Sequence, residues 1–295
     1  GKVMKGIHSQ TAPLLVIGAG ICWGIIGLFS RQLAALGFSP LQITFGRSAV
    51  TAVVMLLSAL YQSPRSLIVS VRDSWMFLGT GLCSIVFFNI CYFTAMEWTT
   101  LSMAAILLYT APSIVMILSV ILFKEAFTPV KAVCLVLSFA GCVLVSGLGV
   151  GTINGIGVLA GLGAGLGYAL YSIFGRYALA KYRPLTVTTW TFLIASIGLA
   201  GWAHLPAMVA VCLASPAAGI LFLCLGLIST ALPFCLYTIA LSHMEAGKAS
   251  ILASIEPLTS TIIGITVFHE SLSVLNGCGI LCILGAVMLL NKKNG

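Results

Sequence analysis

Ten long apolar runs constrain this chain more than any other feature of its sequence. A helix needs about 20 mostly apolar residues to cross the hydrocarbon core of a bilayer. Runs of roughly that length occupy residues 12–34, 41–61, 74–96, 101–123, 129–147, 155–178, 184–203, 216–240, 246–268 and 274–291. Backbone polar groups cannot stay unpaired in lipid, so each run is expected to be a helix. The two-residue alternation of a membrane β-barrel is not visible.

The composition agrees with a chain that is solvated mainly by lipid. Hydrophobic residues make up 60% of it and charged residues only 7%, against about 25% charged residues in a typical soluble domain. So few charges cannot cover a water-facing surface. The sequence therefore predicts an all-α polytopic membrane protein with ten transmembrane helices. The basic segment Lys2–Gln10 lacks a clear cleavage site after it, so the first run is interpreted as a membrane helix and not a signal peptide.

The distribution of basic residues predicts the orientation. They sit singly in short loops and form no basic stripe, which argues against a nucleic-acid partner. Of the 14 Lys and Arg residues, 12 fall on one side when the N-terminus is placed inside, and the other two, Arg31 and Arg47, lie inside spans near the outer side. Lys and Arg are biased towards cytoplasmic loops. We therefore expect a multi-pass protein of the cell inner (cytoplasmic) membrane, with both termini cytoplasmic.

The two halves of the chain match each other at a nearly constant offset of about 145 residues. Matched pairs include Gly20 with Gly165, Tyr92 with Tyr237, Pro112 with Pro257 and Glu125 with Glu270. We predict two five-helix repeats, residues 1–148 and 149–295. Because five is odd, the second repeat would enter the membrane inverted. Inverted repeats around a central site are typical of secondary transporters that work by alternating access.

The candidate site lies where the ninth span is interrupted. Glu256 is about 11 residues from either end of that span, where a charged carboxylate costs roughly 2.5–3.5 kcal/mol on insertion scales. Desolvation favours its protonated form, so it could couple transport to protons or bind an amine. The alternative is a structural hydrogen bond to a neighbouring helix. Pro112 and Pro257 should kink their spans and either free carbonyls for a substrate or only shape the bundle.

Several polar aromatic residues occur at mid-depth and are candidates for the cavity lining, because a buried indole N–H or phenol O–H needs a partner. Each could also be ordinary packing. Together with Glu256, the residues predicted from position to bind substrate are Trp23, Tyr109, Tyr168, Tyr171 and Trp190, with Asn89 and Tyr92 one turn apart on one face of the third span. Asn89 is equally well explained as a hydrogen bond between helices. Arg47 could attract a carboxylate, pair with Glu256 or extend outward to the interface.

Glycines are concentrated in the first and sixth spans. GxxxG spacing occurs at Gly20–Gly24, Gly157–Gly161 and Gly163–Gly167, which lets helices approach closely. Both spans are therefore expected to line the contact between the repeats.

Signals for enzyme chemistry are missing from the sequence. HExxH, GxSxG and Walker motifs do not occur, and the four histidines do not cluster. Cys278 and Cys282 are one helical turn apart, but they are interpreted as packing residues and not as a soft-metal site. We expect no metal, no cofactor and no enzymatic activity.

The chain resembles the drug/metabolite transporter superfamily, in its ten-helix EamA-like branch. The resemblance rests on "YTAPSIVMILSVILFKE" (109–125), its counterpart "SIEPLTSTIIGITVFHE" (254–270), "GAGICWGIIGLFSR" (18–31) and Arg47. It implies a basket of helices around a central cavity, with the fifth and tenth spans peripheral. It places Trp23, Tyr92, Tyr109, Tyr168, Tyr237 and Glu256 nearest that cavity. Glu125 and Glu270 are expected to cap the helix that follows each of them.

Three functional hypotheses follow. The first is a secondary transporter of small metabolites, most consistent with export of amino acids or related compounds. The second is uptake of a small organic cation such as a choline-like molecule, bound by aromatic rings and Glu256. The third is a non-transporting membrane subunit. The expected partners are a small-molecule substrate and the lipid bilayer; ten spans can enclose a path alone, so a monomer without an obligatory protein partner is expected.

Overall fold

The computed structural model describes residues 10–146 and 154–292, and this part of the chain is helical with short connections. Ten of its helical segments are long and apolar enough to cross a membrane, which confirms the predicted number of spans. They are Ala12–Ala35, Pro40–Gln62, Val71–Trp98, Met103–Leu122, Pro129–Ser146, Gly155–Leu179, Pro184–Ala203, Pro216–Leu241, Ala246–Thr266 and Val274–Asn291. Lys2, Lys5 and Lys293, used to predict the orientation, lie outside the described residues.

Five spans are single regular helices. These are α3 (Pro40–Gln62), α8 (Pro129–Ser146), α9 (Gly155–Leu179), α10 (Pro184–Ala203) and α16 (Val274–Asn291). The α3 helix begins with a complete capping box, in which the Ser39 hydroxyl and the Gln42 side chain satisfy each other's backbone N–H groups.

The other five spans are interrupted. Breaks in the α-helix separate α1 (Ala12–Gly24) from α2 (Ile26–Ala35), α6 (Leu101–Leu108) from α7 (Ala111–Leu122), and α14 (Ala246–Leu252) from α15 (Ile255–Thr266). The third span has η3 (Val71–Asp73), α4 (Ser74–Leu78), the π-helical η4 (Gly79–Val86) and α5 (Phe87–Trp98). The eighth has α12 (Pro216–Gly226), the π-helical η5 (Leu227–Ala231) and α13 (Leu232–Leu241). Such irregularities are often found at functional sites.

Two short elements lie between spans. The η2 turn (Pro64–Leu67) follows α3, and α11 (Leu205–Ala214) joins α10 to α12. The sequence analysis did not predict α11, since ten residues are too few to span a bilayer. Its Met208 packs into a small core with Phe38 and Phe222.

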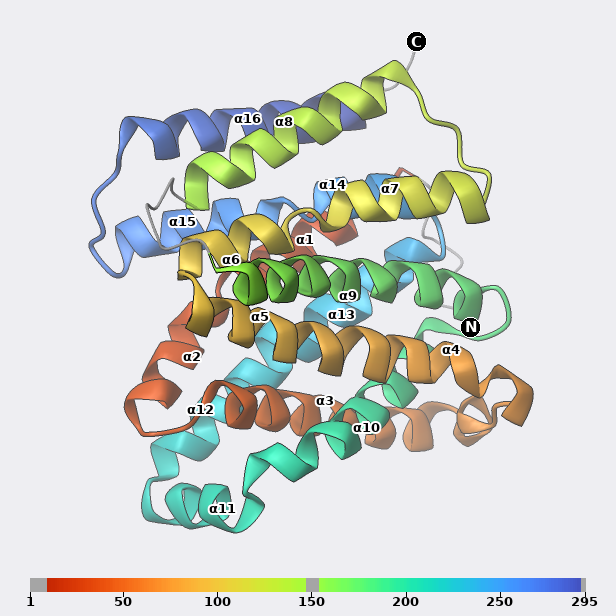
Figure 1. Cartoon of the computed structure of the whole chain (residues 1–295). Helices are drawn as coiled ribbons and strands as arrows, with labels where there is room; N and C mark the ends of the chain where they lie inside the picture. The colour runs from red at the N-terminus through yellow and green to blue at the C-terminus, as the bar shows by residue number, and fades with distance from the viewer. Residues whose placement is uncertain (1–9, 147–153, 293–295) are drawn as a thin grey trace.

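The arrangement places α8 and α16 side by side along one edge of the bundle (Figure 1). They approach closely at two glycines: a Cβ added to Gly141 would lie 2.8 Å from the carbonyl oxygen of Gly279. On the other side α3 packs against α10, and α1 and α9 lie between these pairs. The fifth and tenth spans are therefore peripheral, as expected from the resemblance.

The helix pairings follow the predicted repeat. The α1 segment packs on α13 and α15, and α9 makes the equivalent contacts with α5, α6 and α7. Even single contacts correspond: Gly20 faces Ile255, and Gly165 faces Thr110. The boundary proposed between residues 148 and 149 lies outside the described residues, and the division into two inverted repeats stays a prediction.

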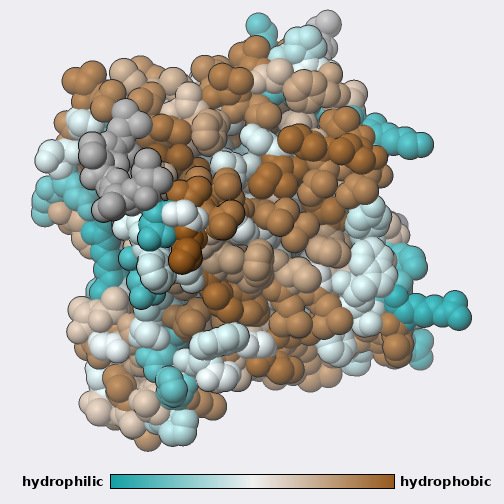
Figure 2. Space-filling view, viewed as in Figure 1, coloured by the Kyte–Doolittle hydropathy of each residue, from teal (hydrophilic) through white to brown (hydrophobic). Residues whose placement is uncertain are grey.

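The surface agrees with a lipid environment. Figure 2 shows hydrophobic residues over the middle of one face, with hydrophilic residues gathered mainly towards its two ends. Large side chains that are well exposed include Leu57, Leu159, Ile197 and Met288. A monomeric soluble protein rarely exposes an apolar area of this extent, so the band is a surface for acyl chains.

Candidate functional site

The site is built around the break in the ninth span. Glu256 lies in the first turn of α15, where the helix dipole favours a negative charge. Its backbone N–H donates to the carbonyl of Ala253 at 3.0 Å. Pro257 follows in the same turn, where its missing N–H leaves no helical hydrogen bond unmade. The break is thus stabilised by a hydrogen bond within its own turn, and the carbonyl of Ala253 is not left unpaired.

The equivalent break in the fourth span is arranged in a similar way. Pro112 lies in the first turn of α7. Thr110, just before it, donates to the carbonyl of Leu107 through both its backbone N–H and its hydroxyl, at 3.2 and 2.6 Å. The kinks predicted at the two prolines are therefore present as complete breaks, and the carbonyl of Leu107 is satisfied locally.

The first span supports Glu256 from the side. A Cβ added to Gly24 would lie 2.5 Å from Cβ of Thr259 and 2.8 Å from the carbonyl oxygen of Glu256. A Cβ added to Gly20 would come within 3.2 Å of the Glu256 backbone nitrogen. The Gly20–Gly24 motif therefore does what its spacing predicted, because it brings α1 against the turn that holds the carboxylate.

Tyrosines surround the carboxylate. The hydroxyl of Tyr168, from α9, donates to Oε2 of Glu256 at 3.1 Å. Tyr92 and Tyr109 lie close enough to Glu256 to interact with its charge. All four residues lie within their spans, and each is only half-buried. The structure therefore brings together a carboxylate and three phenol groups, of which Tyr168 also lines a cavity.

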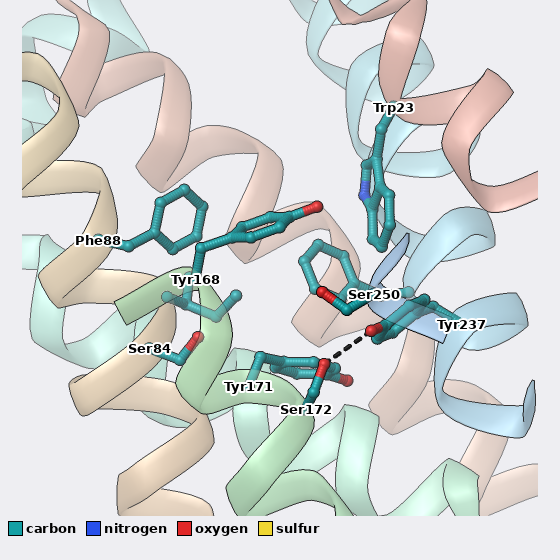
Figure 3. A pocket seen from close by; sticks show the side chains of 10 residues that line it. Trp23, Ser84, Phe88, Tyr168, Tyr171, Ser172, Tyr237 and Ser250 are labelled. Carbon is teal, nitrogen blue, oxygen red and sulfur yellow. Dashed lines mark hydrogen bonds between the residues drawn. The ribbon is translucent and has the colours of Figure 1, made fainter. Parts of the chain in front are cut away.

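A narrow cavity lies next to Tyr168 (Figure 3). Its volume is about 20 Å³, which is room for about one water. The lining residues are Trp23, Ser84, Ile85, Phe88, Tyr168, Tyr171, Ser172, Phe234, Tyr237 and Ser250. Four of the predicted site residues, Trp23, Tyr168, Tyr171 and Tyr237, are thus brought together here.

Two hydrogen bonds and ring packing hold this cavity narrow. Ser172 bonds the Tyr237 hydroxyl at 2.6 Å, and Tyr171 bonds Thr238 at 2.5 Å. The Trp23 ring packs edge-on against Phe234, with centroids 5.0 Å apart. Since a buried phenol or hydroxyl is costly without a partner, these bonds favour the closed arrangement.

A larger cavity opens at the other end of the bundle. Its volume is about 660 Å³, and it lies where α3 begins and where α5 and α10 end. The lining residues are Ser39, Pro40, Leu41, Gln42, Ile90, Phe93, Thr94, Met96, Glu97, Trp202 and His204. We call this the wide end of the bundle, and the opposite end, where α9 and α13 end, the closed end.

Charged residues reinforce the closed end. The Glu125 carboxylate accepts hydrogen bonds from the backbone N–H groups of Ala246 and Gly247, at 3.0 and 3.4 Å. Arg176 donates to the carbonyls of Leu241 and Met244, at 2.6 and 2.7 Å. Glu125 thus caps α14 of the other half, and the expectation that it caps the following helix, α8, is wrong.

At the wide end, the corresponding charged contact is weaker than those at the closed end. Glu270 pairs with Arg31 at 3.2 Å, and both side chains are more than half exposed. An exposed pair of this kind contributes about 0–1 kcal/mol. The expectation that Glu270 caps the next helix, α16, is also wrong, since the Ser273 hydroxyl occupies that cap by accepting from Asn276.

Two further candidates, Asn89 and Trp190, lie outside the narrow cavity. Asn89 donates to the carbonyl of Ile85 in its own span at 2.7 Å, and so neither joins two helices nor lines the narrow cavity. Trp190 packs near Met76 and donates to the carbonyl of Leu67 at 3.0 Å, which holds the connection after α3. The mid-span position of Trp190 correctly indicated that its indole N–H has a partner. That partner is a loop carbonyl, and the side chain does not line the narrow cavity.

Arg47 turns inward to η5. Its Nε donates to the Thr230 hydroxyl at 2.8 Å and one terminal nitrogen donates to the carbonyl of Ser229 at 3.3 Å. It also lies close enough to Glu256 to interact with its charge. Among the described residues it forms no ion pair within 4.0 Å. Arg47 thus secures the π turn of the eighth span, and extension to the interface is excluded.

The serines of the site were not among the residues predicted from the sequence. Ser84, Ser172 and Ser250 all line the narrow cavity. Serine in an apolar span is common, so residue type alone gave no warning. One signal was available: Ser84 and Ser229 match at the same offset of 145 as the other repeat pairs, and the structure places both in π turns.

Comparison with known proteins identifies the family. The sequence pattern of the EamA-like transporter family matches residues 10–147 and again residues 155–292. The uncharacterized transporter YvbV of Bacillus subtilis (strain 168) is 24% identical, with 99% of this chain and 95% of that protein aligned. The threonine/homoserine exporter RhtA of Salmonella typhimurium (strain SL1344) is 26% identical, over 94% and 90% of the two chains.

The fold also has a counterpart among solved structures. A crystal structure that is 18% identical in sequence superposes with a TM-score of 0.79, over 96% of each chain. At this identity the likeness concerns the fold alone. The two family matches, together with the ten spans, show that this chain is a multi-pass membrane protein that belongs to the EamA-like transporter family.

Proposed function

We propose that the protein is a secondary transporter that exports small amino acids or related metabolites across the cytoplasmic membrane by alternating access. The observation that carries this proposal is the position of Glu256. It is a half-buried carboxylate at a broken helix, with a wide cavity towards one end of the bundle and a nearly closed cavity towards the other. Binding at an interrupted helix near mid-depth is the arrangement used by many secondary transporters.

The carboxylate suits the ammonium group of an amino acid. A cation can bind a carboxylate through a charge-assisted hydrogen bond, which is stronger than a neutral one. The Tyr168 hydroxyl orients one oxygen of Glu256 and leaves the other carboxylate oxygen available as an acceptor. The exporters called RhtA, from Salmonella and Escherichia coli, support amino acids as the substrate class.

The wide end is assigned to the outside of the cell. Lys131, Arg176 and Lys181 all lie at the closed end, where α9 and α13 end and α8 and α14 begin. Basic residues favour the cytoplasm, so the closed end would face the cytoplasm and both termini would lie there. In the opposite state the cavity beside Tyr237 would open inward to load the substrate.

The proposed machinery needs only this chain and a gradient. The path runs within one bundle, so we propose that a monomer transports without a cofactor or an obligatory partner. Proton antiport through Glu256 and facilitated diffusion are both consistent with the arrangement.

The test is counterflow in proteoliposomes with labelled amino acids, at several pH values. We expect accumulation of at least one small amino acid, reduced at least tenfold and no longer dependent on pH in Glu256→Gln. The matched control is Glu97→Gln, which removes a carboxylate from the wide cavity but not from the centre. Transport with unchanged pH dependence in Glu256→Gln would exclude proton coupling through this residue.

A second candidate function is uptake of a small quaternary cation. The rings of Trp23, Tyr168 and Tyr237 around the narrow cavity favour it, because aromatic faces bind such cations, and Tyr168 also bonds the Glu256 carboxylate. Counterflow of choline, together with the absence of counterflow for amino acids, would establish this function. Failure of both substrate classes, together with recovery of a stoichiometric partner chain, would favour a non-transporting subunit instead.

A further inference from the structure

A fully buried hydroxyl that lines the narrow cavity is left without a partner in the described part of the chain. Ser84 is fully buried in η4, and its Oγ has no hydrogen bond in the described part of the chain. Buried polar atoms nearly always have partners, because an unpaired one keeps the cost of losing its water. An exception that borders a cavity is therefore a place where a ligand or a water would be expected to bind.

Ser84 makes no hydrogen bond to the backbone of its own helix. A helical Ser or Thr usually donates to the carbonyl four residues back. Thr51 and Thr188 do so here, at 2.8 and 2.9 Å. In η4 the backbone is wider than an α-helix, and Ser84 makes no such bond. Figure 3 shows Ser84 across the cavity from Ser250 and Tyr237.

The repeat supplies an internal comparison. Ser229 matches Ser84 at the offset of 145, lies in the π turn η5, is fully buried and also lacks a partner for Oγ. Ser229, however, does not line the narrow cavity. Ser119 and Ser196, in α7 and α10, also have an Oγ without a partner among the described residues. Of these four serines, Ser84 alone lines the cavity beside Tyr168.

The cavity has the size of a single polar group. Its 20 Å³ admit about one water-sized group, and most of its lining consists of aromatic rings. Two of its hydroxyls, on Ser172 and Tyr237, already bond each other. Tyr168 lines this cavity and also donates to Glu256. A single side chain therefore separates the cavity from the carboxylate.

We propose that Ser84 selects substrates that carry a side-chain hydroxyl, whose tip occupies this cavity while the ammonium group binds Glu256. This inference rests on the proposed function and narrows its substrate class to small hydroxylated amino acids. A site that hydrogen-bonds a hydroxyl discriminates against an analogue without one, because its own buried group is then left unpaired.

The experiment compares substrates that differ by one hydroxyl. Counterflow of labelled threonine is measured with unlabelled competitors in two pairs: threonine and valine, and homoserine and norvaline. The two members of each pair differ only by the exchange of a hydroxyl for a methyl group. In the native protein the hydroxylated member should compete about tenfold better, the effect of one net hydrogen bond. Ser84→Ala should bring this ratio close to one, and Ser229→Ala should leave it unchanged.

The outcomes separate the two proposals. Equal competition in the native protein, or an unchanged ratio in Ser84→Ala, overturns the role of Ser84 while transport of amino acids stands. No counterflow of any amino acid by protein that elutes as a single folded species overturns both. If Ser84→Ala does not transport, its thermal stabilisation by threonine and by valine in detergent gives the same ratio from binding alone.

Discussion

The close contact between α1 and α15 gives a prediction that can be worked from the structure. Replacing Gly24 by alanine adds one Cβ, which would lie 2.5 Å from Cβ of Thr259 and 2.8 Å from the Glu256 carbonyl. Ordinary contacts of this kind are 3.4–4 Å. The Glu256 carbonyl belongs to the backbone and cannot rotate away, so α1 and α15 must separate by about an ångström.

The expected magnitude follows from two opposing terms. Overpacking of this kind typically costs about 1–3 kcal/mol. Alanine is intrinsically the better helix former, by about 1 kcal/mol, and Gly24 needs no left-handed backbone. A net loss would therefore come from the close packing and not from backbone conformation. At about 2–4 °C for each kcal/mol, Gly24→Ala should lower the unfolding midpoint by several degrees.

The assay is thermal unfolding in detergent, followed by monodispersity on size exclusion, with counterflow measured in parallel. Gly27→Ala is the matched control, because its added Cβ would meet only Nε of Arg31 at 3.8 Å. We expect the control to be at least as stable as the native protein. If Gly24→Ala and Gly27→Ala unfold at the same temperature, the described packing of α1 on the Glu256 turn is refuted.

Two further predictions concern the ends of the bundle and the π turn. Glu125→Ala should remove the cap of α14, which is worth about 0.5–2 kcal/mol, and should speed hydrogen exchange in residues 246–252 severalfold. Glu97→Ala is the control. Unchanged exchange in Glu125→Ala would show that the cap does not hold the closed end. Arg47→Ala should lower the free energy of unfolding by about 1.5–3 kcal/mol, because charged hydrogen bonds to η5 are lost. Arg31→Ala removes only an exposed ion pair worth about 0–1 kcal/mol. Equal unfolding midpoints for the two variants would contradict the inward role of Arg47.

The relation between the predicted and observed site residues has a physical explanation. Glu256 and Tyr168 were predicted because a polar group at mid-span needs a partner, and the structure gives these two residues each other. The same reasoning predicted that Trp190 lines the cavity, and this prediction is wrong. Its indole does have a partner, the carbonyl of Leu67, but the rule specifies only that a partner exists and not where it lies.

The capping glutamates illustrate a second limit. A carboxylate after a span was expected to cap the helix that follows it, since a helix N-terminus favours negative charge. Glu125 does bind a helix N-terminus, but that of α14, 121 residues further along the chain. The preference is local chemistry, whereas the choice among several available N-termini depends on which helix ends meet in space.

The sequence by itself determined the membrane environment, the number of spans and the correspondence between the halves. These follow from composition and periodicity, because a bilayer imposes helix length and backbone pairing on any segment that enters it. Only the tertiary structure decided which π turn exposes its serine to a cavity and which one binds Arg47. Ser84 and Ser229 occupy equivalent positions in the sequence, and they differ because their surroundings come from helices far away along the chain.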